Sequence, residues 1–368
     1  MSSSLGDHKP TLLCGTIALL AMSQRLVGYS DVKDNREPDP EIWSDGESQK
    51  VPTDQISMSA HPSGALIHLA MDNAKTIINV LKAVQFRDLA TVFATANGLK
   101  ITVEDAKCIQ GNAFLHAALF REFHLARDII SFKTNINVLI DCLSIFGTSG
   151  QNSAVSLVLV YKNHGNTVDL ILEENGVVAE CNIKTMEAFE ILDFDFSGSS
   201  KIDKVIVKSE CMREAFSELD MSSEVLEFAL LPPPAAQPRL RLTTYGLAGS
   251  MHFDLPRTSD QVEVFESTSA QPRLARYRLS LLRPATSRAL AMATRISIRV
   301  NERGFLSMQF MINLPDAQVA FVEFFCVPDE DEADESGSPT AADQLSSVPQ
   351  PGPSTRPTQR VFEPDWSD

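Results

Sequence analysis

One order of predicted elements, a strand, a helix and then several short strands, recurs four times along this chain. The clearest helix is Asn73–Val84, where apolar residues recur at i, i+4 and i+7 from Ile77, a period typical of a helix buried along one side. Asp72 or Asn73 can cap its N-terminus. A supersecondary order that repeats within one chain indicates internal duplication, even where residue identity between the copies is weak.

The predicted strands are short runs rich in β-branched residues, bounded by turn signals such as Asn97–Gly98, which we expect to form a hairpin turn. The first unit has strands at Leu89–Thr95, Leu99–Val103 and Ile109–Leu115. The second has a strand at Ile129–Phe132, a helix at Asn135–Phe146 closed by Gly147, and strands at Val155–Tyr161, Thr167–Leu172 and Val177–Ile183. The third begins with Lys204–Val207, a helix at Glu210–Leu219 and Val225–Leu230. The fourth has Tyr277–Leu281, a helix at Pro284–Ala293, and strands at Arg295–Val300, Phe305–Met311 and Gln318–Phe325.

Length and composition bound the number of domains. A chain of 368 residues with 43% apolar content can bury two domain cores. We expect a disordered or divergent extension at 1–64, a first domain at 65–183, a connector at 184–200, a second domain at 201–328 and an acidic, Pro- and Ser-rich disordered tail at 329–368. The prolines at Pro232–Pro234 interrupt a predicted hairpin and favour a longer loop there.

The formal charge of −16 is concentrated in the two ends of the chain. Residues 328–368 hold 10 acids and 2 bases, and residues 1–64 hold 9 and 5. The remaining 65–327 has 25 bases against 29 acids, a net of −4. A nearly neutral body can still gather its bases on one surface, so the acidic total does not exclude DNA as a ligand.

The cysteine spacing argues against a zinc-binding protein, and the length of the N-terminal apolar run argues against a membrane-spanning protein. The six cysteines are scattered, with no C-x-x-C spacing and no neighbouring histidines, so we expect reduced thiols and no zinc. The run Leu12–Met22 is too short to cross a bilayer, which takes about 20 residues. A signal peptide is the alternative, but the preceding segment carries Asp7 and only Lys9 as a base. We therefore expect a divergent leader or a misplaced start, and no membrane association.

Three stretches, Ala65–Gly147, Leu192–Leu230 and Arg276–Ile312, carry a resemblance to a known family. They closely resemble the Rad-one family, a subunit of the three-subunit checkpoint clamp (Rad-nine, Rad-one and Hus-one) and a relative of proliferating cell nuclear antigen. The resemblance ends at Phe321–Glu332, so it covers roughly residues 64 to 332. It implies an α+β sliding-clamp fold of two similar domains, each with two strand-helix-strands units, with helices on the inner face and sheets outside.

The resemblance also implies a function. We expect a non-catalytic subunit of a heterotrimeric DNA-damage checkpoint clamp in the nucleus, which encircles double-stranded DNA without sequence preference. Its partners would be two paralogous clamp subunits, a clamp loader, and checkpoint and repair proteins.

A ring of this kind faces DNA phosphates with lysine and arginine on its helices. The stripe Lys75, Asn79 and Lys82 lies opposite the apolar face of the first helix, although an ordinary solvated face is the alternative. Glu210, Glu214 and Glu218 on the third helix would repel phosphate, so we expect weak, non-specific contact. The expected DNA-facing residues are Lys75, Lys82, Arg87, Lys208, Arg213, Arg283 and Arg288.

Subunits of such clamps join when the last strand of one first domain pairs with an edge strand of the next subunit's second domain. By position these edges are Gly176–Lys184 and Gly249–Leu255, and the alternative is that both are covered within the chain. The expected interface residues are Val178, Cys181, Ile183, Met251 and Phe253.

The resemblance further implies a peptide-docking pocket on the outer face. The matching positions are Val103, Leu192 in the connector, Phe325 and Pro328, and the alternative is that these residues are ordinary core. The connector 184–200 has too many apolar residues for a free linker, so we expect it to lie on the domain surface.

Catalysis is the competing hypothesis, because some relatives of this family are described as exonucleases. Asp193 and Asp195 form a carboxylate pair, with Asp203 and Asp220 as the nearest further acids. A two-metal nuclease needs several carboxylates converging on paired ions, and no such group is visible in the sequence. No Gly-rich phosphate loop with a lysine occurs. We therefore expect no enzyme, metal or cofactor, with a metal-dependent 3′–5′ exodeoxyribonuclease as the alternative.

Overall fold

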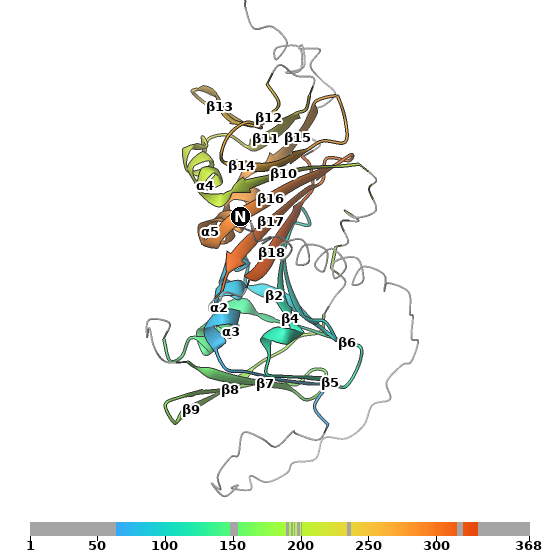
Figure 1. Cartoon of the computed structure of the whole chain (residues 1–368). Helices are drawn as coiled ribbons and strands as arrows, with labels where there is room; N and C mark the ends of the chain where they lie inside the picture. The colour runs from blue at the N-terminus through green and yellow to red at the C-terminus, as the bar shows by residue number, and fades with distance from the viewer. Residues whose placement is uncertain are drawn as a thin grey trace, which may run out of the picture. The chain divides into compact units, whose positions relative to one another are not determined.

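The computed structural model describes residues 64–147, 154–188, 191–192, 194, 196, 199, 201–233, 237–314 and 319–329 (Figure 1). The expectations for the N-terminal extension and the acidic tail therefore lie outside the described residues, apart from Gly64 and Asp329.

The chain runs through the same order of elements twice (Figure 1). The first half comprises β1 (Ile67–Met71), α2 (Ala74–Ala83), β2 (Leu89–Thr95), β3 (Gly98–Asp105), β4 (Ile109–His116), a short 3-10 helix η1 (Ala117–Leu119), β5 (Glu122–Leu125), β6 (Ile129–Asn135), α3 (Ile136–Leu143), β7 (Ser156–Tyr161), β8 (Val168–Glu174) and β9 (Val177–Ile183). The second comprises β10 (Ile202–Lys208), α4 (Ser209–Glu218), β11 (Val225–Leu231), β12 (Arg239–Gly246), β13 (Gly249–Pro256), β14 (Val262–Glu266), β15 (Arg273–Arg278), α5 (Leu279–Met292), β16 (Ala293–Asn301), β17 (Leu306–Asn313) and β18 (Val319–Cys326). Each half contains two strand-helix-strands units, which confirms the predicted repeat.

Three antiparallel sheets contain these strands. Their orders are β5-β1-β7-β8-β9, β14-β10-β16-β17-β18-β4-β3-β2-β6 and β13-β12-β11-β15. The nine-stranded sheet is continuous between the halves because β18 pairs with β4, from Phe321 opposite Phe114 to Cys326 opposite Ile109. Backbone pairing therefore joins two strands that are far apart in the sequence.

Local signals explain where the first helices begin. The Asn73 side chain accepts a hydrogen bond from the Lys75 N–H at 3.1 Å, and Asn135 caps α3 in the same way. The predicted strand Tyr277–Leu281 and helix Pro284–Ala293 are displaced, because α5 begins at Leu279, five residues before its proline. A proline most often occupies the first turn of a helix, so the sequence predicted a helix that begins at Pro284. Leu279 and Leu282 are fully buried, and their packing stabilises a helix that begins before the proline.

Sequence patterns misplace the turn between β2 and β3. Thr95 pairs with Gly98, so Ala96 and Asn97 form the turn and Gly98 opens β3. Gly98 has φ 136°, and a Cβ there would lie 2.1 Å from the Leu115 carbonyl oxygen. Glycine is required at this position by the close approach of β4.

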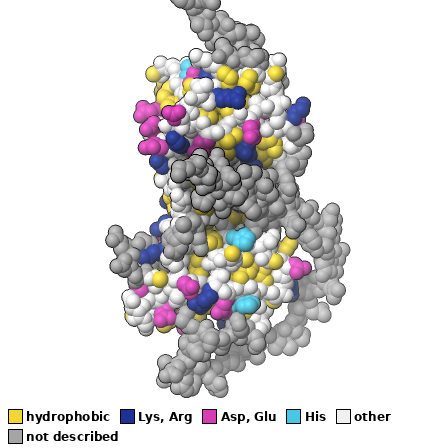
Figure 2. Space-filling view, viewed as in Figure 1, with side chains coloured by type: hydrophobic (Ala, Val, Ile, Leu, Met, Phe, Trp, Pro, Cys, Tyr) yellow, Lys and Arg dark blue, Asp and Glu magenta, His cyan; other side chains and the backbone are white. Residues whose placement is uncertain are grey.

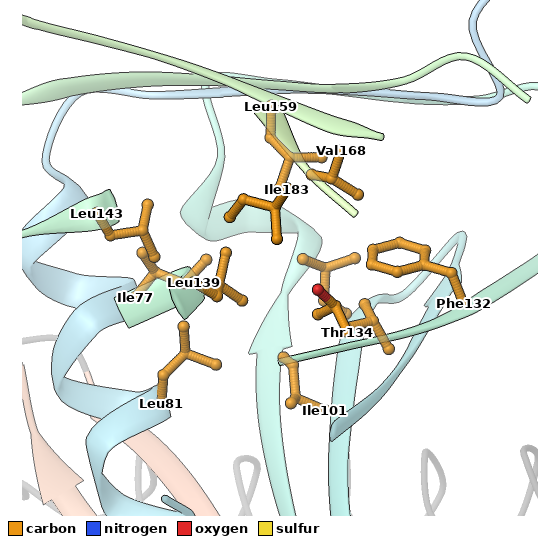
Figure 3. A pocket seen from close by; sticks show the side chains of 12 residues that line it. Ile77, Leu81, Ile101, Phe132, Thr134, Leu139, Leu143, Leu159, Val168 and Ile183 are labelled. Atoms are coloured by element: carbon orange, nitrogen blue, oxygen red, sulfur yellow. The ribbon is translucent and has the colours of Figure 1, made fainter. Parts of the chain in front are cut away.

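A small cavity of about 30 Å³ lies in the first half between α2, α3 and the sheets (Figure 3). Ile77, Leu81, Leu139 and Phe132 are among its apolar lining residues. Thr134 also lines it, but its hydroxyl donates to the Lys184 carbonyl oxygen at 3.2 Å. A space of about one water molecule is far below the roughly 300 Å³ of a small-molecule site, so this cavity is a packing void.

Among the residues that the structure describes, no helix is long and apolar enough to cross a membrane. The cysteines in these ranges, Cys108, Cys142, Cys181, Cys211 and Cys326, are free thiols.

Candidate functional site

Helices from both halves form a row against the nine-stranded sheet, in the order α3, α2, α5 and α4 (Figure 1). A polar link crosses this row just after α2. Gln85 Nε2 donates to Asn137 Oδ1 in α3 at 2.7 Å, and Gln85 Oε1 accepts a hydrogen bond from Arg288 in α5. The side chain of Gln85 therefore links α3 of the first half to α5 of the second half.

The bases of the first helix occupy the side of α2 that faces away from the core. Lys75 and Lys82 are half-buried there, while the apolar face of the helix is buried. Arg87 is exposed but forms an ion pair with Asp105, whose hydrogen bond and charge raise the pKa of the guanidinium. The charge of Arg87 is thus partly neutralised within the chain, which the sequence did not predict.

The four predicted bases of the second half have different surroundings. Lys208 is exposed at the N-cap of α4, and Arg213 is exposed on that helix, with its Nη1 3.4 Å from Ser209 Oγ. Arg283 donates to the Met221 sulfur, and Arg288 is held by Gln85. The row therefore includes cations that already have partners within the chain.

Three glutamates dominate the exposed side of α4. Glu210, Glu214 and Glu218 are all exposed, with Arg213 among them. Figure 2 shows acidic side chains gathered at the upper left of the view, over α4. This helix therefore presents net negative charge.

Among the described strands each sheet has two edges, which are β5 and β9, β14 and β6, and β13 and β15. The edges that the sequence predicted as interfaces are β9 and β13. Each follows a two-residue turn, since Glu174 pairs with Val177 and Gly246 pairs with Gly249. The pair that closes such a turn is hydrogen-bonded on both sides, and antiparallel pairs then alternate. The outward-facing backbone groups accordingly belong to Val178, Glu180 and Asn182 in β9, and to Ser250, His252 and Asp254 in β13.

The predicted interface side chains are not all accessible. Val178 is 55% exposed, and Cys181, Met251 and Phe253 are half-buried. Ile183 is 4% exposed and packs in the core, so its assignment as a contact residue is corrected. It lies at the end of β9, where the inward side of the strand meets the core.

Exposed apolar side chains beside these strands were not predicted from the sequence. Val138 on α3 is 43% exposed, and Ile145 in the turn that follows α3 is 54% exposed. Between them, the Cys142 thiol meets Cys181 of β9, and burial together with that contact raises the pKa of Cys142 to about 11. α3 and β9 therefore form one continuous surface.

Backbone and aromatic contacts hold the connector against the nine-stranded sheet. The Leu192 N–H donates to Glu104 Oε1, and Gln110 Nε2 donates to the Leu192 carbonyl oxygen, both at 2.9 Å. Phe194 stacks on Phe325 with ring centroids 5.8 Å apart. The expectation that this segment lies on the domain surface is met at the described connector residues.

These contacts change the predicted docking pocket. Phe194 and Phe196 both pack on Phe325, so the connector itself occupies that surface. Val103 is fully buried in β3, which makes it core, and Pro328 lies beside Gly304. The assignment of Val103 to an open pocket is therefore wrong, because strand alternation points its side chain into the domain.

The described acids near the connector serve structural roles. Asp203 is 1% exposed, accepts the Thr268 N–H at 2.7 Å and forms an ion pair with Arg273. Burial opposes its ionisation, but these partners outweigh burial and lower the pKa of Asp203. Asp220 accepts hydrogen bonds from the N–H and hydroxyl of Ser222.

Asp193 and Asp195 lie outside the described residues. Within the ranges that the structure describes, no three His, Cys, Asp or Glu side chains converge to hold a metal ion.

The order of elements and the three sheets define a DNA sliding-clamp fold. The solved structure of PCNA from Thermococcus kodakaraensis superposes with a TM-score of 0.56, covering 72% of this chain and 100% of that one. At 16% sequence identity the likeness concerns the fold alone.

Relatives found by sequence show which family of sliding-clamp proteins includes this chain. The family model described as "Repair protein Rad1/Rec1/Rad17" matches residues 67–312. The human "Cell cycle checkpoint protein RAD1" is 48% identical over 263 residues, which are 71% of this chain and 91% of that protein. This chain belongs to the Rad1/Rec1/Rad17 family, as the resemblance predicted. A more distant relative, "DNA repair exonuclease REC1" of Mycosarcoma maydis, is 28% identical over 227 residues, 49% of each chain.

Proposed function

We propose that this chain is a non-catalytic subunit of a heterotrimeric DNA-damage checkpoint clamp, which encircles double-stranded DNA and holds checkpoint and repair proteins. Its two domains would be 65–183 and 201–328, joined by the connector 184–200. Two paralogous subunits would complete the ring, a clamp loader would place it on DNA, and the complex would act in the nucleus. The single observation that carries the proposal is that β9 and β13 are each an edge strand among the described residues, β9 in the first half of the chain and β13 in the second.

An unpaired edge with exposed apolar side chains favours pairing with another chain. β9 carries Val177 and Val178 at 60% and 55% exposure, and Leu247 at the turn before β13 is 97% exposed. An isolated monomer would normally protect such strands with charge, proline or a covering segment. Pairing of β9 with one subunit and of β13 with another would give this chain two neighbours, as a closed ring requires.

Contact with DNA would be electrostatic and weak. Lys75 and Lys82 lie on the helix row, but the glutamates of α4 lie on it too. Phosphate contacts provide affinity without sequence information. Closure of a ring would retain the protein on DNA even where each contact is weak.

Measuring the mass of the purified complex tests the assembly. Mixed with its two paralogous subunits, the chain should give one particle with a one-to-one-to-one composition by native mass spectrometry. Alone, it should sediment as a monomer or associate weakly. A stable homotrimer of this chain would contradict the proposal.

The exonuclease is the second candidate, because REC1 carries that name in the same family. A Mg²⁺ titration with a 3′-labelled strand would separate the two functions. We expect no metal-dependent digestion by the purified chain. Digestion that Asp193→Ala abolishes, and that the surface change Asp260→Ala leaves intact, would establish an enzyme instead.

A further inference from the structure

β9 and β13 each lie at one edge of a sheet, and the surfaces around these two strands differ in charge and polarity. We call β13 with the exposed side of α4 the β13 end, and β9 with the exposed side of α3 the β9 end. We propose that the β13 end accepts a clamp subunit whose docking strand and adjoining helix carry lysine or arginine, and that it discriminates against this chain's own β9 end. The inference rests on the proposed function, because it assumes pairing between strand edges.

The β13 end combines a free strand edge with a negatively charged helix. α4 exposes Glu210, Glu214 and Glu218 at i, i+4 and i+8, so they follow one side of the helix. Met221, just beyond α4, is 53% exposed. In Figure 1, α4 and β13 lie at the same end of the second half. A partner strand paired with β13 would therefore bring its adjoining helix toward the glutamates.

α3 and β9 contain no cation with which to meet those glutamates, and the nearest base along the chain is the exposed Lys184, just past the end of β9. Residues 135–147 and 177–183 contain neither lysine nor arginine. Their exposed side chains include Val138 on α3 and Ile145 in the turn after it, together with the acids Asp141 and Glu180. This surface is therefore apolar and acidic.

Pairing of two copies of this chain would bring the two surfaces together. Edge-to-edge addition makes the two sheets continuous, so helices packed beside the joined strands approach each other. The glutamates of α4 would lose their hydration when packed against Val138 and Ile145. They would also lie near the acids Asp141 and Glu180. Unpaired buried charge and like-charge contact both disfavour the wrong partner. A subunit with basic residues at the matching positions removes both costs.

Charge reversal tests this inference in the assembled protein. The triple variant Glu210→Lys, Glu214→Lys, Glu218→Lys would be compared with wild type for pairwise binding to each purified paralogous subunit. We expect affinity for one subunit to fall at least about tenfold, with the other unchanged. The fall should be larger at about 0.05 M than at about 0.5 M salt, because salt screens charge pairs.

Two controls separate charge from folding. The neutral triple variant with glutamine should weaken binding less than the lysine variant, and Glu302→Lys, an exposed acid on the turn between β16 and β17, should not weaken it. Equal melting temperatures establish that the variants fold. Unchanged binding to both subunits, or equal weakening for both, would overturn the inference while leaving the clamp proposal intact. If the wild-type chain binds neither subunit, the proposed function itself fails.

Discussion

At the scale of single residues, buried ion pairs fix the second half of the chain. Asp203, Glu227 and Glu323 are at most 2% exposed, and each pairs with an arginine. A buried carboxylate without its partner costs several kcal/mol, so these positions tolerate substitution poorly. The sequence shows the acids, but burial decides their role.

The Asp203→Asn variant should be destabilised by about 3 kcal/mol, because it leaves Arg273 without a charge partner. Its effect should depend on pH. The pKa of Asp203 is lowered by folding, so its stabilising contribution is complete above the unfolded value of about 4 and is lost as pH falls through the lower folded value. Urea unfolding of both proteins from pH 7 to 3 should show their difference shrinking below about pH 4.

The exposed turn residue Asp260 provides the matched control. Asp260→Asn should leave the unfolding free energy within about 0.5 kcal/mol of wild type at every pH. An Asp203→Asn difference that stays constant down to pH 3 would contradict the pairing argument.

At the scale of elements, the direction of the backbone N–H and C=O groups alternates along β9. The groups of every second residue bond to β8, and those of the residues between them face outward. Val178 turns its N–H outward, whereas its neighbour Ala179 bonds to β8. One strand therefore offers substitutions that test an interface and others that test the fold.

Val178→Pro removes an outward donor and should abolish ring formation while the monomer stays folded. Val178→Ala keeps the N–H and should retain the ring. Ala179→Pro removes an inward donor and should lower the melting temperature of the monomer. Size-exclusion chromatography with light scattering reports assembly, and a ring that tolerates Val178→Pro argues against β9 as an interface.

The connector is a second element whose position is testable. Phe194 is 8% exposed between Phe305 and Phe325, so Phe194→Ala should cost about 3 kcal/mol. The change should also speed limited proteolysis within 184–200. Leu274→Ala, at a side chain 44% exposed on β15, is a control that should do neither. Cleavage at the wild-type rate would show that the aromatic contacts do not hold the connector.

At the scale of the whole molecule, helices of both halves share one row because β4 pairs with β18 and Gln85 links α3 to α5. Helices α2, α4 and α5, which are distant in the sequence and carry bases, thereby lie on one side of the nine-stranded sheet (Figure 1). In the proposed ring these bases would act together on DNA.

Reversing Lys75 and Lys82 to glutamate should reduce retention of the loaded ring on circular DNA, to the same degree for any DNA sequence. The slope of log affinity against log salt should become shallower by about one for each phosphate that the variant no longer binds. The exposed Lys201, which lies outside the helices, is the control for reversal. Retention equal to wild type would mean that the stripe on α2 faces away from DNA.

Sequence periodicity predicted the repeated element order, because burial of one helix face and strand alternation are local patterns that each unit carries. It also located β2 and β9 at the observed residues, since β-branched runs between turn residues leave little choice. It missed β5 and β14, whose pairing with the distant strands β1 and β10 decides their structure. It also missed β12, which pairs with its sequence neighbours β11 and β13.

What the sequence determined by itself is the family, the repeat of four units and the candidate edges, all of which follow from local pattern and resemblance. Tertiary structure decided which side chains remain available. It buried Val103 and Ile183, engaged Arg87 and Arg288, and covered Phe325 with the connector. Accessibility and pairing depend on residues far apart in the chain, and a linear pattern does not record which of them meet.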